Sequence, residues 1–482
     1  MFRLLIAIWF GKVVYFLTRI LNTGGGSAAP GHYSLRIEPQ LVQKLVSQIP
    51  QNIVITGTNG KTTTSRLLNH LVQTQKIKTL RNSTGSNLER GIASSLIAKV
   101  NWLGKIQDVD IGIWELDEAA FNKSVFQIKP QIIVFLNAFR DQLDRYGEVD
   151  SVVRKWMETL EKIDWNPVVL INGNDENVLS LNSWSEKETE GKSDKVGKYQ
   201  VFKVKGDYHF GEKNLKLEYH LVRADFEASD IKTMGLDGIE FKITMNHKPL
   251  TINLPIPGIY HVFDFLAAFA AYYNLNLPVE RINESLKNYS PAFGRVEKVQ
   301  IGSNEAYIFL IKNPAGATLV FETIQPEIGA KDRILVALND NFADGKDVSW
   351  IWDAEFSKIN RVSKISGSVR TVIPAKAGIY TNNSVSGSRI SSLESPQDSL
   401  QSGMTEIVCS GTRAEDLAVR LKYAGVETEN IEVIQNLEGA LEKALGGLEG
   451  KLFILPTYTA LLELQKILAK KGHKEHYWKE EG

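Results

Sequence analysis

The feature that most constrains this chain is a glycine turn between an apolar strand and a helix. Residues 53–55 are β-branched, which is typical of a buried strand, and apolar residues return at helical spacing after Lys61. Gly57 and Gly60 frame the turn, which reads Gly-Thr-Asn-Gly-Lys-Thr. Backbone N–H groups of such a turn face an anion, and the lysine adds a positive charge. The stretch therefore predicts a site for nucleotide phosphates.

The turn is a short form of the phosphate loop. In the usual form four residues separate the two glycines, whereas only Thr58 and Asn59 separate them here. The hydroxyl of Thr62, directly after the lysine, is a suitable ligand for Mg²⁺. Because the turn follows an apolar strand, a nucleotide site explains it better than chance does.

A second candidate feature is a group of acids that follows the apolar stretch 110–114. Glu115, Asp117 and Glu118 stand where that predicted strand ends. A carboxylate at a strand end near a phosphate loop is well placed to ligate Mg²⁺. The alternative is that these acids only begin a helix, whose first turn favours negative charge. We prefer Glu115 as the ligand because it stands at the strand terminus.

The composition is that of an ordinary globular protein. Of 482 residues, 43% are hydrophobic and 23% charged, and the 56 basic residues balance 56 acidic ones. This balance gives no overall indication of nucleic-acid binding. The single cysteine, Cys409, excludes an intramolecular disulfide and any multi-cysteine zinc site, and it fits a cytoplasmic protein.

Strands that alternate with helices predict an α/β fold with a parallel sheet, whose site lies along the edge where the strands end. We expect a central domain over residues 46–296, with a small antiparallel insertion at 183–250. A second, Rossmann-like α/β domain follows at 297–482. Within it, residues 366–403 are rich in Ser, Gly and Asn and predict a dispensable, disordered insertion. The predicted strands are 77–80, 110–115, 131–136 and 168–171, then 306–311, 333–338, 407–409 and 452–455.

Residues 1–45 form a separate N-terminal segment that begins with an amphipathic helix. The apolar run from Met1 to Asn22 carries only the positive charges of Arg3, Lys12 and Arg19. These charges interrupt the run, so it does not offer an unbroken membrane span. A basic amphipathic helix suits either packing on the body of the protein or an anionic membrane face, and the sequence leaves both open.

These motifs, with several others, resemble the Mur ligase family, and most closely its MurT branch. The resemblance runs nearly end to end. It is carried by Gly24–Gly26 with Pro30-Gly31, Thr56–Thr64, Glu115–Ala119, Phe139–Gly147, Phe293–Arg295, Lys312–Gly316, Asp344–Asp353, Arg420–Gly425 and Pro456–Ala460. The phosphate loop alone indicates only the wider family, whereas Lys312–Gly316 and Asp344–Asp353 point to the MurT branch.

The resemblance implies the ligase-like subunit of a two-part amidotransferase. ATP would phosphorylate the α-carboxyl of D-glutamate in the lipid II stem peptide at the inner membrane face. Ammonia, released from glutamine by a separate class I glutaminase of the GatD type, would then displace phosphate and leave D-isoglutamine. Activating a poor electrophile in this way requires positive charge around the moving phosphoryl group.

The resemblance also implies roles for individual residues. Lys61 and the loop backbone would hold the β- and γ-phosphates, Thr62 and Glu115 would hold Mg²⁺, and Arg295 would contact phosphate from the domain hinge. His261 stands where the family usually has an asparagine that faces the adenine, and Asp264 replaces a second asparagine. The expected nucleotide-binding residues are Thr58, Asn59, Gly60, Lys61, Thr62, Thr63, Arg295 and His261.

A further role concerns the glutaminase. A Cys–His pair benefits from a carboxylate that orients the histidine, and the resemblance implies that this domain lends such an aspartate across the interface. Asp353 is the first choice and Asp347 the second, and the sequence alone does not separate them. Many MurT proteins hold zinc through four cysteines in the middle-domain insertion, but this chain has none at 183–250, so we expect no zinc.

Three rival interpretations remain at this stage. The chain could add an amino acid, as other Mur-type ligases do, without a glutaminase partner. A folate polyglutamate ligase fits the motifs of the last domain less well. A non-catalytic scaffold that binds ATP and holds a partner is disfavoured by the intact Lys61, Thr62 and Glu115.

Overall fold

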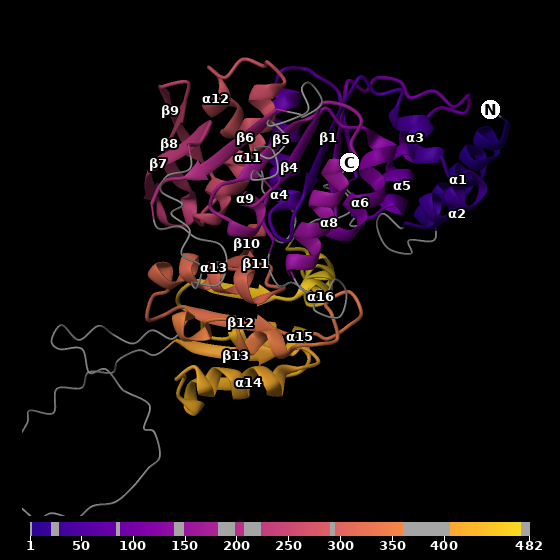
Figure 1. Cartoon of the computed structure of the whole chain (residues 1–482). Helices are drawn as coiled ribbons and strands as arrows, with labels where there is room; N and C mark the ends of the chain where they lie inside the picture. Colours follow the sequence, from indigo (N-terminus) through magenta and orange to yellow (C-terminus); the bar gives the residue numbers. More distant parts are fainter. Residues whose placement is uncertain are drawn as a thin grey trace, which may run out of the picture.

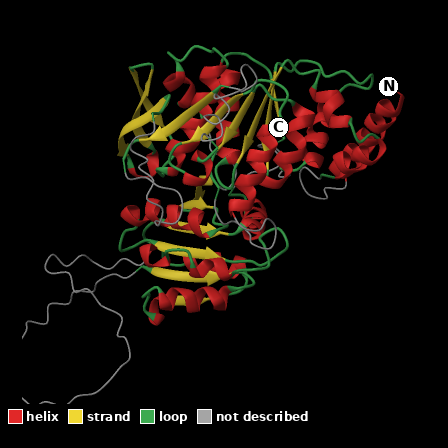
Figure 2. Ribbon diagram, in the orientation of Figure 1, coloured by secondary structure: helices red, strands yellow, loops and turns green. Residues whose placement is uncertain are grey.

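Two α/β units follow one another along the chain (Figures 1 and 2). The computed structural model describes residues 2–20, 28–82, 87–138, 149–181, 198–206, 223–289, 295–359 and 405–473. A nine-stranded sheet forms the first unit and a six-stranded sheet the second. The α/β fold expected from the sequence is confirmed. The predicted insertion at 366–403, the glycines 24–26 and the motif 139–147 lie outside the described residues.

The central sheet has the strand order β2-β3-β1-β4-β5-β6-β7-β8-β9. Its pairings are parallel from β2 through β7, and only β7-β8 and β8-β9 are antiparallel. The strands are β1 Gln51–Thr56, β2 Thr79–Arg81, β3 Ile111–Leu116, β4 Ile132–Phe135, β5 Val168–Asn172, β6 Tyr199–Val204, β7 Phe226–Thr233, β8 Ile239–Met245 and β9 Lys248–Leu254.

Helices cover both faces of this sheet, so its inner strands read as continuous apolar runs. In β1, Ile53 and Ile55 pack with α4 and α11 on one face, while Val54 packs with α5 and α6 on the other. The helices are α4 Lys61–Thr74, α5 Glu89–Lys99, α6 Glu118–Ile128, α8 Val149–Glu161, α9 Glu176–Leu179, α11 Tyr260–Asn274 and α12 Ile282–Leu286, with a 3-10 turn at Gly235–Asp237.

The segment predicted as an antiparallel insertion continues the central sheet instead of forming one of its own. β6 adds to β5 in parallel, and β7, β8 and β9 then extend the same sheet to its edge. Phe226, Phe241 and Ile252 belong to the same core as the phosphate-loop helix α4. The antiparallel pairing predicted for this segment is found between β7, β8 and β9, whereas β6 pairs in parallel with both of its neighbours.

Three helices precede the first strand: α1 Phe2–Ile20, α2 Ala29–Ile37 and α3 Leu41–Val46. α1 packs on α2 and α5 through Ala7 and Ile8, which are fully buried. The contact is close at Gly11, where a Cβ atom would lie 2.2 Å from the Ser34 hydroxyl. The helix thus packs on the body of the protein. Within the described residues, no helix is long and apolar enough to cross a membrane.

The second sheet has the order β10-β11-β15-β12-β13-β14, with only β10 antiparallel to its neighbour. Its strands are β10 Arg295–Ile301, β11 Asn304–Phe309, β12 Arg333–Ala337, β13 Glu406–Ser410, β14 Ile431–Val433 and β15 Leu452–Pro456. Its helices are α13 Pro314–Ile324, α14 Ala414–Tyr423, α15 Leu437–Leu445 and α16 Tyr458–Lys470, with 3-10 turns at Gln325–Glu327, Ser349–Trp352, Phe356–Ile359 and Thr428–Asn430.

Candidate nucleotide site

The phosphate loop joins β1 to α4 through two glycines in left-handed conformations. Gly57 has φ 138° and Gly60 has φ 86°, values that side chains with a Cβ rarely adopt. A Cβ on Gly60 would also lie 2.1 Å from Oδ1 of Asp264 in α11. Both constraints require glycine at position 60, so the loop and α11 can approach closely.

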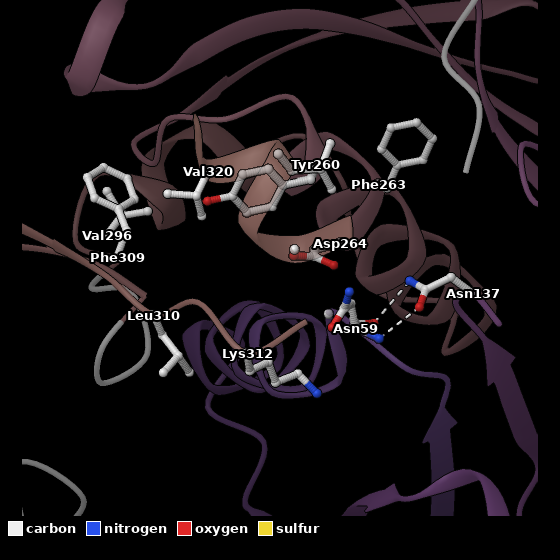
Figure 3. Close-up of a pocket in the computed structure, with 13 residues that line it drawn as sticks. Asn59, Asn137, Tyr260, Phe263, Asp264, Val296, Phe309, Leu310, Lys312 and Val320 are labelled. Carbon is white, nitrogen blue, oxygen red and sulfur yellow. Dashed lines mark hydrogen bonds between the residues drawn. The ribbon is translucent and has the colours of Figure 1, made fainter. Parts of the chain in front are cut away.

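Asn137, which follows β4, fixes the loop from the neighbouring strand. The backbone N–H of Asn59 donates to Oδ1 of Asn137 over 2.7 Å, and Nδ2 of Asn137 donates to the Asn59 carbonyl over 3.1 Å (Figure 3). The N–H of Thr58 donates to the Asn137 carbonyl over 3.0 Å. These contacts hold the loop in one shape before any ligand is considered.

Lys61 is buried at the N-terminus of α4 with its amine directed back across the loop. Its Nζ donates to the carbonyls of Gly57 and Thr58, the latter over 3.2 Å. The carboxylates of Asp117 and Glu118 lie 3.5 and 3.9 Å from the same nitrogen. The acid cluster after β3 therefore faces the lysine, which balances part of its negative charge.

Glu115 and Thr62, the two expected Mg²⁺ ligands, lie side by side. The Thr62 hydroxyl donates to Oε2 of Glu115 over 2.8 Å, and the Ser65 hydroxyl donates to Oε1. Asn82 holds the Glu115 backbone at both its N–H and its carbonyl, each over 2.8 Å. The carboxylate is thus fixed beside a hydroxyl at the start of α4.

This donor set fits Mg²⁺, which prefers oxygen ligands and usually keeps waters and phosphate oxygens in its shell. Among the described residues, no group of three or more His, Cys, Asp and Glu side chains could hold a metal by itself. A cation here would therefore depend on the bound phosphates as well as on Thr62 and Glu115.

The second domain reaches the phosphate loop through residues that we had not assigned to the site. Asn313 and Asn59 exchange side-chain hydrogen bonds of 3.0 and 3.3 Å. The amine of Lys312 donates to the Thr58 carbonyl over 3.4 Å. Asn313 is also the N-cap of α13, since its Oδ1 accepts from the Gly316 N–H over 2.8 Å. Its position before Pro314 predicts such a cap, but no sequence signal predicts the contact with a loop 254 residues away.

A pocket lies between the phosphate loop, α11 and the start of the second domain (Figure 3). Aromatic and aliphatic side chains form most of its walls, and a few polar groups line the rest, which is typical of small-molecule sites. The lining residues are Asn59, Gly60, Asn137, Tyr260, Phe263, Asp264, Val296, Phe309, Leu310, Lys312, Gly316, Leu319 and Val320.

His261 does not line this pocket. It is buried in α11, where its Nδ1 lies 3.0 Å from Oδ2 of Asp264 and its ring lies 4.2 Å from that of Tyr260. Tyr260 and Asp264, on either side of it in the helix, reach the pocket instead. The expected contact between position 261 and the adenine stays a prediction.

For two other residues that were expected to bind the nucleotide, the structure says little about their role. Thr63 is fully buried in the first turn of α4. Arg295 begins β10, opposite Phe309 of β11, but its side chain lies outside the described residues. Their predicted roles are therefore untested.

Asp347 and Asp353 lie on the surface of the second domain, apart from the nucleotide pocket. Both are exposed and flank the 3-10 turn Ser349–Trp352. Asp347 accepts a hydrogen bond from the Ser349 N–H over 2.8 Å, and hydrogen bonds from Ser349 lower the pKa of this carboxyl. The backbone N–H of Asp353 donates to the Trp350 carbonyl over 3.1 Å, whereas its carboxylate makes no hydrogen bond or ion pair within the described part of the chain.

Arg420 of α14 fixes the segment that carries Asp353. Its guanidinium donates to the carbonyls of Ile351 and Ala354, each over 2.8 Å, and lies 5.5 Å from the centre of the Trp352 ring. Burial lowers the pKa of this guanidinium. Trp352 in turn packs edge-on against Tyr423, and both rings are largely exposed. The result is a rigid aromatic surface beside Asp353.

Comparison with known proteins agrees with this architecture. Residues 55–272 match the Mur ligase middle domain, and residues 310–372 and 393–461 match the MurT ligase C-terminal domain. Among solved structures, MurF from Acinetobacter baumannii aligns with a TM-score of 0.61 at 15% identity, covering 92% of this chain and 80% of that one. Folylpolyglutamate synthase from Mycobacterium tuberculosis gives 0.59 at 14%, covering 98% and 100%. At such identities these structures show the fold alone.

The phosphate loop, the acid cluster beside it and the two successive α/β domains together define a Mur-type ligase. Two relatives extend over almost the whole chain. The MurT subunit of lipid II isoglutaminyl synthase (glutamine-hydrolyzing) from Streptococcus pneumoniae is 29% identical, over 96% of either chain. Its counterpart from Staphylococcus aureus is 27% identical, over 90% of this chain and 91% of the relative. The chain belongs to the Mur ligase family, as a member of its MurT branch.

Proposed function

We propose that the chain is the ligase subunit of a lipid II amidotransferase of peptidoglycan synthesis. It uses ATP to activate the α-carboxyl of D-glutamate in the stem peptide as an acyl phosphate, and ammonia from a GatD-type class I glutaminase converts it to D-isoglutamine. The observation that carries the proposal is that the similarity to subunits of lipid II isoglutaminyl synthase continues through the second domain. The match of residues 310–372 and 393–461 to the MurT ligase C-terminal model favours this function over that of an amino-acid-adding ligase.

The loop residues 57–62 provide the phosphate site for this reaction. ATP with Mg²⁺ supplies the phosphoryl group and neutralises part of its charge. Thr62 and Glu115 would hold the cation. The N–H groups of Thr58 and Asn59 are bound to Asn137, so the N–H groups at the N-terminus of α4 would face the phosphates. Lys61 leaves its carbonyl and carboxylate partners to meet the phosphate oxygens, because a doubly charged anion offers a stronger interaction than the loop carbonyls.

Lys312 adds a second positive charge from the other domain. Its amine already lies 3.4 Å from the carbonyl of Thr58, next to the place where the phosphates would lie. A cation contributed by a second domain stabilises the transferring phosphoryl group only when the domains are together. The Asn59–Asn313 pair holds them in that arrangement.

The pocket above the loop is the proposed adenosine site. Tyr260 and Phe263 offer aromatic surface, while Asp264 offers a carboxylate to a nucleotide hydroxyl or amine. His261 orients Asp264 through their 3.0 Å contact. A direct contact between position 261 and the adenine, which the resemblance implies, stays a prediction.

On the ammonia side, Asp353 orients the histidine of the glutaminase. It is preferred over Asp347 because its carboxylate is exposed and uncommitted within the described residues, whereas Asp347 is bound to Ser349. The neighbouring Trp352 and Tyr423 offer the kind of aromatic surface that anchors interfaces. Since the substrate is lipid-linked, we place the complex in the cytoplasm, peripheral to the inner face of the plasma membrane.

Reconstitution tests the proposal. The chain is combined with the glutaminase, lipid II and ATP, and supplied either with glutamine or with ammonium and no glutaminase. Amidation under both conditions, with release of phosphate, is expected. Phosphate release that depends on an added amino acid would favour the amino-acid-adding ligase, and no ATP hydrolysis with every component present would favour a non-catalytic scaffold.

A further inference from the structure

One side of α1 carries a long stripe of exposed apolar residues. Their spacing of three or four positions places them along one side of the helix. The opposite side, through Ala7, Ile8 and Gly11, packs on α2 and α5. We call the exposed stripe the outer face of α1: Phe2, Ile6, Trp9, Phe10, Val13, Phe16, Leu17 and Ile20.

A neighbouring turn extends this surface. Trp102 and Leu103, which follow α5, are exposed by 58% and 74%. The indole N–H of Trp9 donates to the carbonyl of Trp102 over 2.8 Å, and the amine of Lys12 lies 5.5 Å from the Trp102 ring. These contacts fix the turn and the helix as one surface at the outer end of the central domain (Figure 1).

We propose that the outer face of α1 and the Trp102–Leu103 turn dock on an anionic lipid bilayer. Soluble proteins rarely leave a contiguous apolar patch of this kind uncovered. A helix that is rich in Trp, Phe and Leu, with basic residues as its charged groups, is suited to lie in a membrane interface. The helix inserts its outer face among the headgroups and does not cross the bilayer.

The charges around the surface favour lipid over a second copy of the chain. α1 contains no acidic residue, and its charged residues are Arg3, Lys12 and Arg19. Lys99 and Lys105, on either side of the turn, are exposed as well. Anionic headgroups attract such a surface, whereas two copies that met through it in a symmetric dimer would bring like charges together.

The inference adds a membrane-docking surface to the proposed function. Only the purpose of the docking rests on that function. Docking would hold the nucleotide site near a substrate whose stem peptide is attached to a membrane lipid. The surface itself is argued from exposure and charge, so it can be tested without substrate, nucleotide or glutaminase.

The test is sedimentation of the full chain with lipid vesicles. Vesicles of phosphatidylcholine with phosphatidylglycerol should bind it, vesicles of phosphatidylcholine alone should bind it more weakly, and added salt should weaken the binding further. The double variant Phe16→Ser/Leu103→Ser should lower the binding at least about tenfold. The matched control, Phe342→Ser/Tyr423→Ser, removes side chains that are 79% and 76% exposed on the second domain and should bind as the parent does.

Three outcomes would overturn the proposal: no binding by the parent chain, equal binding by the α1 variant, or a dimer in solution that the α1 variant abolishes. Equal melting temperatures of the two variants control for folding. Amidation of detergent-solubilised lipid II should persist in the α1 variant. If the parent binds vesicles but shows no amidation, the proposed function fails while the docking surface stands.

Discussion

The phosphate loop and the Asp353 surface are the two regions that the proposed reaction requires, and they are built in opposite ways. At the loop, Lys61, Thr62 and Glu115 are each held by partners within the chain, and Lys61 and Glu115 are buried. At the other region, Asp353 is exposed, and Arg420 fixes the backbone around it and not the carboxylate.

This difference follows from what each region is proposed to bind. A small anion is surrounded by preorganised groups of one chain, and a preorganised site does not have to rearrange during the reaction. A catalytic group that is lent to another protein has to leave its own chain unpaired, because its partner arrives with the second subunit. If this comparison is correct, changes at the two regions affect different half-reactions.

The largest effect is expected for Lys61→Met. Loss of the loop ammonium should lower ATP-dependent amidation by about 10³-fold, with either glutamine or ammonium as the nitrogen source. The assay is release of phosphate together with mass analysis of lipid II. Lys331→Met is the matched control, since Lys331 pairs with Glu449 on the surface and should leave the rate unchanged. A variant at Lys61 with normal activity would remove the loop from the mechanism.

The next largest effect is expected for Asp353→Asn. Glutamine hydrolysis by the complex should fall by at least about 10²-fold, because an amide no longer stabilises the charged histidine. Amidation supplied with ammonium should be unchanged, which separates this variant from that at Lys61. Asp347→Asn is the internal comparison, and a greater loss there would exchange the roles of the two aspartates.

Arg420→Lys should have a smaller effect of the same kind. Lysine keeps the charge but loses the planar fork that donates to the carbonyls of Ile351 and Ala354. We expect glutamine hydrolysis to fall about tenfold while ammonium-supported amidation persists. If both activities fall equally, the variant has destabilised the whole domain, and a melting curve would show it.

The smallest effect is expected where the two domains meet. Asn313→Asp keeps an acceptor for the α13 cap but removes the amide that donates to Asn59. A double-mutant cycle with Asn59→Ala should give a coupling of about 1 kcal/mol in kcat/KM for ATP. Additive changes at the two positions would mean that this contact does not hold the domains together during turnover.

The two regions also differ in how far the sequence could predict them. Thr62 and Glu115 could be assigned because a local pattern, strand, glycine turn and helix, carries the chemistry, and β3 ends beside it. The choice between Asp347 and Asp353 depended on a hydrogen bond from Ser349, which spacing does not predict. The sequence did not indicate that Tyr260 and Asp264 line the pocket, because this depends on how α11 packs over the phosphate loop.

The α/β class, the phosphate loop and the strands β1 to β5, β11, β12, β13 and β15 could be predicted from the sequence alone, because strand periodicity and glycine turns are short-range properties. The strands β7, β9, β10 and β14 were not assigned from the sequence. Tertiary structure decided which distant segments meet. Asn313 reaches Asn59, β6 to β9 continue the central sheet, and α1 buries one side while exposing the other. Such contacts depend on how whole elements pack, so no local pattern contains them.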